Sequence, residues 1–400
     1  MPFDPITDIQ DFKTLGEFGD VNPSITDSST YSFSSPANMK QIFETEIEGC
    51  FLYSRHFNPI NKYLCRALAT LEATEAAQVT ASGMAAITSS ILQLCSSNDE
   101  VVSSWTIYGG TYAFLRNFLP RFGIKVSFVD ITNLDMVKSA ITERTKVIYC
   151  ESISNPLLEV PDLPALAALA RQRNVTLIVD NTFSPLILSP TRHGAQVVVH
   201  SLTKFINGTS DCVAGVICSS KEFVNRVTDI NGGACMLLGP VMDSLRSASI
   251  LKNIHTLHLR IRQHSANAMY LANHLSGLGI KVHYPGLAHH PQHNLMKQLM
   301  NPGYGFGGMM VIDVEKPETA ERLMSSMQEA NVGYLAVSLG YFKTLFSAPA
   351  SSTSSEIPEE TQKRMGLSGG MIRLSVGLDN NIQLTAERIS VCLRKLDLVK

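Results

Sequence analysis

The sequence predicts an α/β fold, with a mostly parallel sheet flanked by helices and a smaller α+β domain towards the C-terminus. From about residue 58 to residue 250, short apolar runs alternate with stretches of helical periodicity, the pattern of a parallel sheet with helices on both faces. Beyond residue 250 the helical stretches lengthen and mix with strand-like runs. We therefore predict an N-terminal arm (1–57), an α/β domain (58–250) and a C-terminal α+β domain (251–400).

The individual elements follow this division. The arm is rich in Ser, Thr, Asp and Pro with weak periodicity, so we predict that it is extended. The α/β domain contains, in order, the stretches "KYLCRALATLEA", "GMAAITSSILQL", "EVVSSW", "KVSFVDI", "KVIYCES", "LPALAALARQR", "TLIVDNT" and "QVVVHS". The last domain contains the helical "HSANAMYLANHLSGLG" and "AERLMSSMQEA" and the strand-like "GMMVIDV" and "MIRLSVG". Between its elements, the Ser-rich "SAPASSTSSEIPEE" predicts a loop over a site.

Composition and charge narrow the class of ligand. The 400 residues are 44% hydrophobic and 17% charged, which is ordinary for a globular chain with a large core. The formal net charge is −2 and no basic stripe occurs, so we expect no nucleic acid and no membrane partner but a small molecule. Acidic residues in "MPFDPITDIQDF" stand where a signal peptide is positive, which favours a cytoplasmic location. Eight cysteines without a CxxC pair indicate reduced thiols.

Reactive side chains gather where the apolar runs end. In open α/β sheets the ligand crevice lies outside the carboxyl ends of the strands, so residues far apart in the sequence converge there. The helix that begins near Gly83 adds unpaired backbone N–H groups and the positive end of a dipole, suited to an anion. The residues at the strand ends are Tyr108, Asn155, Asp180, Ser201, Thr203 and Lys204.

Each of these residues alone has a purely structural explanation. A Ser-Gly pair before a helix is a good N-cap, and a buried Asp180 is explained by a structural hydrogen bond. A lone Lys204 is more often a surface side chain that lies along apolar neighbours. Taken together, the residues predict one cofactor. An amine in an apolar crevice forms a Schiff base with an aldehyde, an aromatic ring stacks on a planar cofactor, and a carboxylate holds a pyridine nitrogen protonated. These are the requirements of pyridoxal phosphate (PLP).

The motifs also resemble a known family. "YSRHFNP", "ASGMAA", "YGGTY", "ESISNP", "VDNTF", "HSLTKF", "AVSLGY" and "IRLSVG" are similar to the Cys/Met-metabolism group of PLP-dependent enzymes over nearly the whole chain. That group includes cystathionine synthases and lyases, O-acylhomoserine sulfhydrylases and methionine γ-lyases. The resemblance implies the PLP-dependent transferase-like fold, the aspartate aminotransferase type I fold. It also implies a homo-oligomer, expected to be a tetramer built from dimers with shared active sites.

The resemblance implies roles for residues at matching positions. Lys204 would be the Schiff-base lysine and proton shuttle, and Tyr108 would stack on the ring and act as acid and base. Asp180 would bind the pyridine nitrogen, and Asn155 would lie near the ring hydroxyl. The phosphate would be held by Gly83, Met84, Ser201 and Thr203, joined by Tyr53 and Arg55 of a neighbouring subunit.

The expected substrate is an amino acid. By the same resemblance, Arg373 would bind the substrate carboxylate in a bidentate pair, with Ser338 close by. "YSRHFNP", "LLGP", "HPQH", "SLGY" and "SSTSSEIP" are most similar to plant-type methionine γ-lyases. Val337 stands where cystathionine lyases usually carry glutamate, which favours an apolar thioether such as methionine. Gly110 and the pair Asn231-Gly232 differ from the bacterial methionine γ-lyases, which carry cysteine and Lys-Asp there.

We therefore expect α,γ-elimination of L-methionine. The alternatives are cystathionine γ-lyase activity and γ-replacement on an O-acylhomoserine, as in cystathionine γ-synthase or a sulfhydrylase. A PLP-binding protein without activity would be expected to lose Tyr108, Lys204 or Arg373, and all three are present. The SxxK of serine β-lactamases is also spelled at Ser201, but it follows a strand and no KTG motif exists. The histidines of "HHPQH" have no accompanying cysteine or carboxylate cluster, so we predict a polar loop and no metal site.

Overall fold

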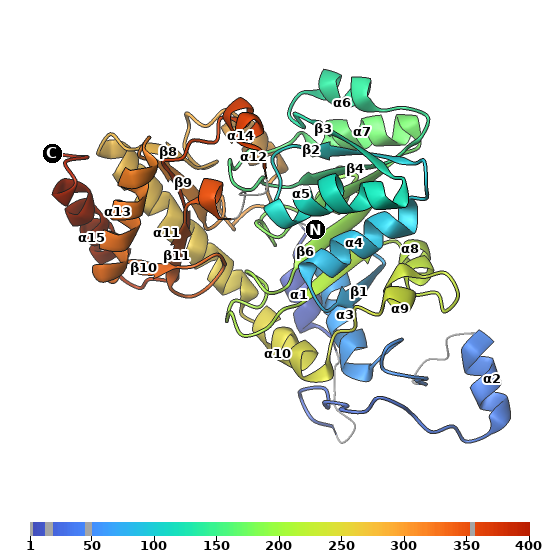
Figure 1. Ribbon diagram of the computed structural model, residues 1–400. Coiled ribbons are helices and arrows are strands. Elements are labelled where there is room, and N and C mark those ends of the chain that lie inside the picture. Colours follow the sequence, from blue (N-terminus) through green and yellow to red (C-terminus); the bar gives the residue numbers. More distant parts are fainter. Residues whose placement is uncertain (1–2, 13–18, 45–49, 353–356) are drawn as a thin grey trace.

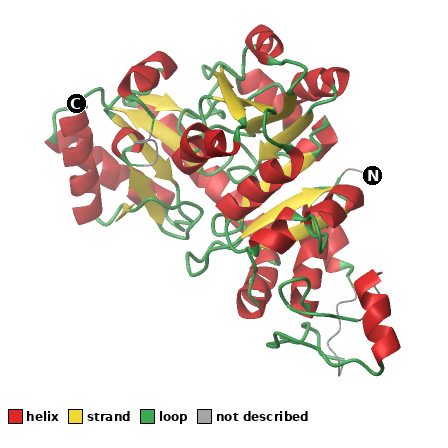
Figure 2. Ribbon diagram, turned by 45° about the vertical axis from the view of Figure 1, so that its right-hand side comes forward, coloured by secondary structure: helices red, strands yellow, loops and turns green. Residues whose placement is uncertain are grey.

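The computed structural model of the chain describes residues 3–12, 19–44, 50–352 and 357–400. Parts of the predicted arm and residues 353–356 of the predicted Ser-rich loop therefore lie outside the described residues. Within the described residues the strands form two sheets, one of seven strands and one of five, each covered by helices (Figure 2). The predicted class is confirmed: a mostly parallel sheet flanked by helices, followed by a smaller α+β part.

The larger sheet provides one edge at which strand ends meet. Its order is β1-β7-β6-β5-β4-β2-β3, and the neighbouring pairs from β6 to β3 are parallel, while β7 runs antiparallel to both its neighbours. Buried apolar runs such as Val197–Val199 fill its centre. The strands are β1 (Ala76–Thr80), β2 (Glu100–Ser104), β3 (Lys125–Val129), β4 (Thr145–Glu151), β5 (Thr176–Asp180), β6 (Val197–Ser201) and β7 (Gly215–Ser219).

Helices cover this sheet, and their starts follow from local chemistry. Asn58 caps α3, which has Pro59 in its first turn, and the Ser82 hydroxyl accepts from Ala85 N at the start of α4. The helices are α3 (Pro59–Leu71), α4 (Gly83–Leu94), α5 (Gly109–Ala113), α6 (Leu134–Ala140), α7 (Leu163–Arg173), α8 (Lys221–Val227), α9 (Ala234–Leu238) and α10 (Ser244–Ile254). Short π or 3-10 segments are η1 (Phe114–Phe118), η2 (Leu119–Phe122), η3 (Pro190–His193) and η4 (Pro349–Ser351).

The smaller sheet has the order β10-β11-β12-β9-β8, and only its β10–β11 pair is parallel. Its strands are β8 (Lys281–His283), β9 (Met309–Asp313), β10 (Gly333–Leu335), β11 (Thr344–Ser347) and β12 (Met371–Ser375). The helices of this part are α11 (Leu257–Gly277), α12 (His293–Leu299), α13 (Pro317–Glu329), α14 (Glu359–Met365) and α15 (Ile382–Lys395). The division at residue 250 stays a prediction, and that position lies within α10.

The prediction of an extended arm is wrong for two of its segments. Asp4 caps α1 (Pro5–Gln10), and α2 (Pro36–Glu44) begins at Pro36, so both starts carried helix signals that the weak periodicity obscured. Ile6 and Ile9 of α1 are buried in the core together with residues of α3. In contrast, α2 projects away from the body of the molecule (Figure 1).

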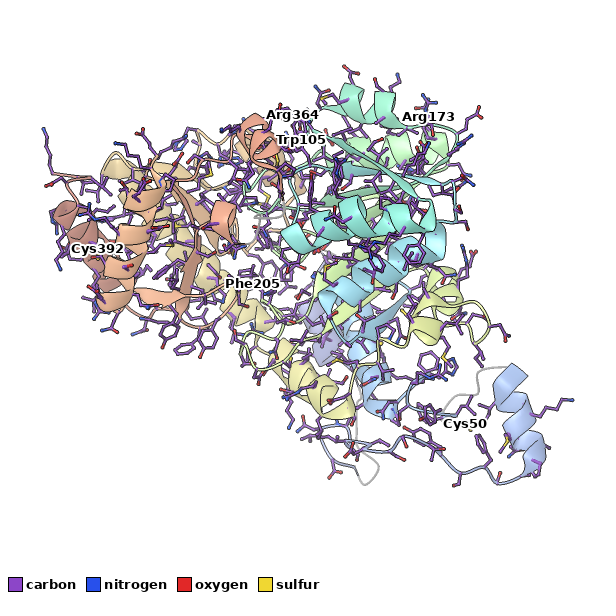
Figure 3. All side chains as sticks on the ribbon, viewed as in Figure 1. Cys50, Trp105, Arg173, Phe205, Arg364 and Cys392 are labelled. Atoms are coloured by element: carbon purple, nitrogen blue, oxygen red, sulfur yellow. The ribbon has the colours of Figure 1, made fainter. Side chains whose placement is uncertain are left out.

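The two sheets meet close to Lys204. Phe205 is buried and packs edge-on against His264 of α11, with 5.2 Å between ring centroids. Gly340 has φ +76°, and a Cβ there would lie 2.5 Å from Phe205 N, so glycine is required on both grounds. Elsewhere in the contact, the Arg364 guanidinium of α14 lies 4.6 Å from the Trp105 ring centroid (Figure 3). Lys204 is therefore held between the two parts of the chain.

Candidate active site

A cavity of about 260 Å³ opens at the carboxyl ends of β4, β5 and β6, between the two sheets. Its walls combine residues from the strand ends of the large sheet, the start of α4 and the small sheet. The predicted site residues that line it are Gly83, Met84, Tyr108, Asn155, Asp180, Ser201, Thr203, Lys204, Val337 and Arg373. The structure thus brings together residues that are nearly three hundred positions apart, as expected from the convergence of strand ends.

Lys204 follows β6 in a tight turn, in which its N–H donates to the Ser201 carbonyl at 3.3 Å. The Nζ amine points into the cavity and donates to the Ser338 hydroxyl at 3.0 Å. Burial lowers the pKa of the Lys204 amine to about 8, and the positive charge of Arg373 acts in the same direction. A larger share of neutral, nucleophilic amine is therefore present near neutral pH than for an exposed lysine.

Two carboxyl groups face the cavity from neighbouring strands. The register pairs Glu151 of β4 with Asp180 of β5, so both side chains lie on the same face of the sheet. The carboxylate of Asp180 accepts from Thr182 N at 2.9 Å and from the Tyr149 hydroxyl at 3.5 Å. Burial raises the pKa of Asp180, and the hydrogen bonds from Thr182 oppose this shift. A positively charged partner in the cavity would stabilise its ionised form.

Glu151, at the end of β4, was not predicted from the sequence as a functional residue. Its two oxygens accept backbone N–H groups from Tyr108 and Asn155, each at 2.7 Å, which ties the segment after β2 to the segment after β4. Burial and the nearby charge of Asp180 raise the pKa of Glu151 well above the usual carboxyl range. Glu151 ends an apolar run, which is the signal that identified Asp180, so the same criterion could have found it.

The start of α4 forms a cradle with the turn after β6. The first-turn N–H groups of Gly83 and Met84 have no carbonyl acceptor within the helix. A Cβ at Gly83 would lie 2.7 Å from Ser201 Cβ, so only glycine allows this approach. Thr203, which accepts from Ala214 N at 3.0 Å, adds a second hydroxyl to the cavity wall. Backbone N–H groups and two hydroxyls at a helix N-terminus suit a phosphate.

Arg373 reaches the cavity from β12 of the small sheet. Its guanidinium donates to Asn155 Oδ1 at 3.0 Å and to the Ser347 hydroxyl at 3.5 Å. The side chain is buried, and burial lowers its pKa to about 10, so it remains positively charged at neutral pH. Val337, which follows β10 of the same sheet, also lines the cavity. Arg373 therefore presents a buried cation to any carboxylate that enters.

Tyr53 and Arg55 do not line this cavity. Both are exposed, and Arg55 donates to the Met236 carbonyl at 2.8 Å. Ser338 does not line the cavity either, but its hydroxyl accepts from the Lys204 amine. Besides Glu151, the lining residues that the sequence analysis did not single out are Ile87, Ile153, Thr182, Phe183, Val213 and Leu339. Most are apolar, and in the sequence an apolar cavity wall looks the same as core.

The described residues contain neither a metal-binding cluster nor a membrane-spanning helix. In the described part of the chain, no group of three or more His, Cys, Asp or Glu side chains could hold a metal ion. His290 is buried, and His293 begins α12. Among the described residues, no helix has both the length and the apolar character needed to cross a lipid bilayer.

These residues fit one cofactor. The buried amine would react with an aldehyde, Asp180 would accept a pyridinium N–H, Tyr108 would stack on a planar ring, and the cradle at Gly83 would take a phosphate. The buried carboxyl groups of Glu151 and Asp180 have the positive charge of Arg373 nearby. A second cation beside Asp180, such as a pyridinium, would balance the remaining negative charge. Fold and site together define a PLP-dependent enzyme.

Comparison with known proteins specifies the family. The family described as "Cys/Met metabolism PLP-dependent enzyme" matches residues 9–387, and the chain belongs to it. Methionine γ-lyase of Arabidopsis thaliana is 47% identical over 381 residues, covering 94% of this chain and 86% of that protein. Cystathionine γ-lyase of Dictyostelium discoideum is 37% identical over 347 residues, covering 86% of this chain and 87% of that protein.

A solved structure agrees. The crystal structure of a candidate O-acetylhomoserine (thiol)-lyase from Campylobacter jejuni, which holds an N'-pyridoxyl-lysine-5'-monophosphate, superposes with a TM-score of 0.90. It is 29% identical in sequence, and the match covers 98% of this chain and 100% of that one. The predicted PLP-dependent transferase-like fold and the PLP cofactor are thereby confirmed.

The lowered pKa of Lys204 predicts how the rate of cofactor uptake depends on pH. Only the neutral amine attacks the aldehyde carbon, so below about pH 8 the rate of uptake by the PLP-free protein should fall as the pH falls. The expected fall is about tenfold per pH unit, measured as the appearance of visible absorbance. Arg373→Met, which removes the neighbouring positive charge, should move the midpoint to higher pH. A wild-type rate that keeps rising to the ordinary lysine value of 10.5 would contradict this prediction.

Proposed function

We propose that this chain is a methionine γ-lyase, which converts L-methionine and water to methanethiol, 2-oxobutanoate and ammonia. The observation that carries the proposal is the composition of the cavity wall, which combines Arg373 with apolar side chains. A buried guanidinium suits the substrate carboxylate, whereas Val213, Val337 and Leu339 are apolar and suit a methylthio group. The 47% identity to the Arabidopsis methionine γ-lyase, above the 37% to a cystathionine γ-lyase, supports the same choice.

Binding would use residues from both sheets. Lys204 would hold the PLP aldehyde, Asp180 the pyridine nitrogen, and Tyr108 the face of the ring. Asn155 would lie beside the ring hydroxyl, where Glu151 fixes its backbone. The phosphate would be held by Gly83, Met84, Ser201 and Thr203. Arg373 would bind the substrate carboxylate through a bidentate pair.

When bound, PLP supplies an electron sink for bonds at the amino-acid Cα. The residues of the chain then move the protons. The neutral Lys204 amine would take the Cα proton, and the Ser338 hydroxyl, which accepts from Nζ at 3.0 Å, would hold the amine in place. Lys204, as the proton shuttle, would also take the proton that leaves Cβ, and the Tyr108 hydroxyl would deliver a proton to sulfur as the Cγ–S bond breaks. Hydrolysis of the remaining four-carbon unit yields 2-oxobutanoate and ammonia.

The same residues serve the alternative reactions. Cystathionine γ-lyase would place a larger, polar distal group in the cavity, and γ-replacement on an O-acylhomoserine would admit a thiol as nucleophile. These activities differ from the proposed one in the group at the end of the substrate side chain, or in the nucleophile that reacts there. The apolar wall there favours methionine over cystathionine, because a polar distal group would lose water contacts without gaining partners.

We further propose a homo-oligomer, a tetramer built from dimers that share active sites. Tyr53 and Arg55 lie on the arm, away from the cavity of their own chain, and would reach the PLP phosphate of a neighbour. The arm segment with α2 stands off the body (Figure 1). Leu237 and Leu238 of α9 are each 61% exposed, and burial against a second copy would remove this apolar surface from water.

We propose residues 58–250 as the cofactor-binding domain and 251–400 as the domain that supplies Arg373. We also propose a cytoplasmic location. All eight cysteines of the chain lie within the described residues and are free thiols, which suits a reducing compartment.

A substrate panel tests the proposed activity. Keto-acid and thiol release should be fast with L-methionine and slower with cystathionine, homocysteine and O-acetylhomoserine. Negligible turnover of methionine beside fast turnover of O-acetylhomoserine with an added thiol would overturn the proposal in favour of γ-replacement.

Val337→Glu should lower the ratio of methionine turnover to cystathionine turnover by about tenfold, since a carboxylate beside the methylthio group must be desolvated. The matched control is Val391→Glu, at a half-exposed position on α15 away from the cavity, which should leave the ratio unchanged. An unchanged ratio in both variants would mean that Val337 does not contact the substrate side chain.

Mixed refolding tests the shared site. Arg55→Ala should bind PLP poorly and Lys204→Ala should be inactive, but refolding the two together should restore part of the activity. In a mixed dimer, one site would have both wild-type residues and the other would have neither. As a control, Lys204→Ala refolded with Asp180→Ala should recover nothing, because these two residues belong to the same cavity. Mixed Arg55 and Lys204 dimers that form but stay inactive would exclude sharing through Arg55.

A further inference from the structure

Behind the cavity, a buried polar cluster lies on the opposite face of the large sheet. Asp180 and Ser201 face the cavity, whereas their chain neighbours Asn181 and His200 face the other way. Both neighbours are fully buried. They meet at a single acceptor, Glu72, the C-cap residue of α3, which is also buried.

The contacts of Glu72 are short and concentrated on one oxygen. His200 Nε2 donates to Oε1 at 2.7 Å, and Asn181 Nδ2 donates to the same oxygen at 3.0 Å. Within the described residues, Oε2 has no hydrogen-bond partner. The backbone of Glu72 is held as well, since its N–H donates to the Leu68 carbonyl at 3.2 Å and its carbonyl accepts from the Thr191 hydroxyl.

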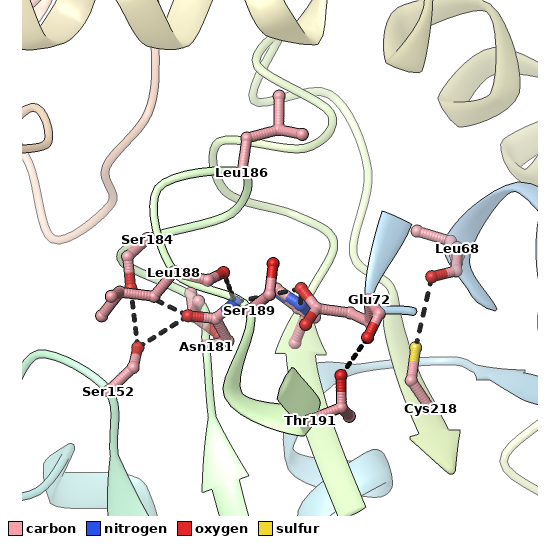
Figure 4. Close-up of polar contacts among 12 residues, drawn as sticks. Leu68, Glu72, Ser152, Asn181, Ser184, Leu186, Leu188, Ser189, Thr191 and Cys218 are labelled. Carbon is pink, nitrogen blue, oxygen red and sulfur yellow. Dashed lines mark hydrogen bonds and ion pairs between the residues drawn. The ribbon is translucent and has the colours of Figure 1, made fainter. Parts of the chain in front are cut away.

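Asn181 has every polar atom of its side chain engaged. Its Oδ1 accepts from the Ser152 and Ser184 hydroxyls, both at 2.8 Å, and its Nδ2 also donates to the Leu188 carbonyl at 2.9 Å. Figure 4 shows this cluster, with Ser152 and Ser184 on one side of Asn181 and Glu72 on the other. Ser152 N also donates to the Asp180 carbonyl at 2.9 Å. The cluster therefore fixes the peptide that carries Asp180.

From this arrangement we infer that Glu72 is a positioning residue for PLP. Its Oε1 links Asn181, which follows Asp180, to His200, which precedes Ser201. One carboxylate oxygen on the far face thereby sets the spacing between the group proposed to hold the pyridine nitrogen and a hydroxyl proposed to hold the phosphate. The inference rests on the proposed roles of Asp180 and Ser201, and it does not depend on which amino acid is the substrate.

Hydrogen-bond geometry distinguishes two variants of Glu72. Glu72→Gln keeps an oxygen at Oε1 and so retains both bonds, with the amide nitrogen in the place of Oε2. Glu72→Met has similar length but removes the acceptor, leaving two buried N–H donors unpaired. The matched controls are the same two substitutions at Glu143, which is exposed in the turn before β4.

The readouts are PLP affinity of the folded, PLP-free protein and the pH midpoint of the visible spectrum of the PLP-loaded protein. Glu72→Met should weaken PLP binding about tenfold or more and shift the midpoint, whereas Glu72→Gln should stay within about threefold of wild type. Both Glu143 variants should behave as wild type. Loss of thermal stability in Glu72→Met, with unchanged PLP affinity and midpoint, would overturn the inference. Equal losses in the Gln and Met variants would also overturn it.

A second variant tests the His200 contact separately from the Asn181 contact, and it replaces Glu72→Met if that variant does not fold. His200→Phe keeps a buried ring but removes the donor that precedes Ser201, so PLP affinity should fall while affinity for pyridoxal, which has no phosphate, stays unchanged. Equal weakening of both ligands, or of neither, would show that His200 does not act through the phosphate contact. Because no amino-acid substrate enters these measurements, their outcome is independent of the test of methionine turnover.

Discussion

The parallel pairing of β4, β5 and β6 is the constraint on which the rest of the structure depends. Parallel strands end at the same edge, and their register places Glu151, Asp180 and Ser201 on one face there. The turn after β6 then carries Lys204 into the same space. A shift of one residue in any of these strands would turn its functional side chain to the opposite face.

Such a concentration of charge in a buried cavity is unfavourable unless partners offset it, because removing an ion from water costs several kcal/mol. Hydrogen bonds within the cavity offset part of this cost. Backbone N–H groups neutralise part of Glu151, Thr182 stabilises Asp180, and Asn155 accepts from Arg373. Burial lowers the pKa of Lys204 to about 8, which increases the share of the neutral amine that a nucleophile requires. The same desolvation that destabilises the charges prepares the site for chemistry.

Neither sheet makes the site alone. Lys204 and Asp180 come from the large sheet and Arg373 from the small one, so the contact between the sheets sets the distance between Lys204 and Arg373 across the cavity. Phe205 and Gly340 pack at that contact directly beside Lys204. On the far face, Glu72 adds rigidity from α3, the helix that follows the arm. The cavity thus depends on both sheets and on the helix behind the large one.

The sequence by itself determined the fold class and most of the cavity, because buried strands are continuous apolar runs and their reactive ends are local features. Lys204, Asp180 and Tyr108 were recognisable in this way. The family was identified by the resemblance of its motifs. Helix α1 was missed because a helix of six residues shows too little periodicity. Only the tertiary structure decided that Glu151 joins two loops and that Glu72 meets Asn181, 109 positions away. Such pairings depend on which faces of distant elements meet, and no local pattern of residues encodes which faces these are.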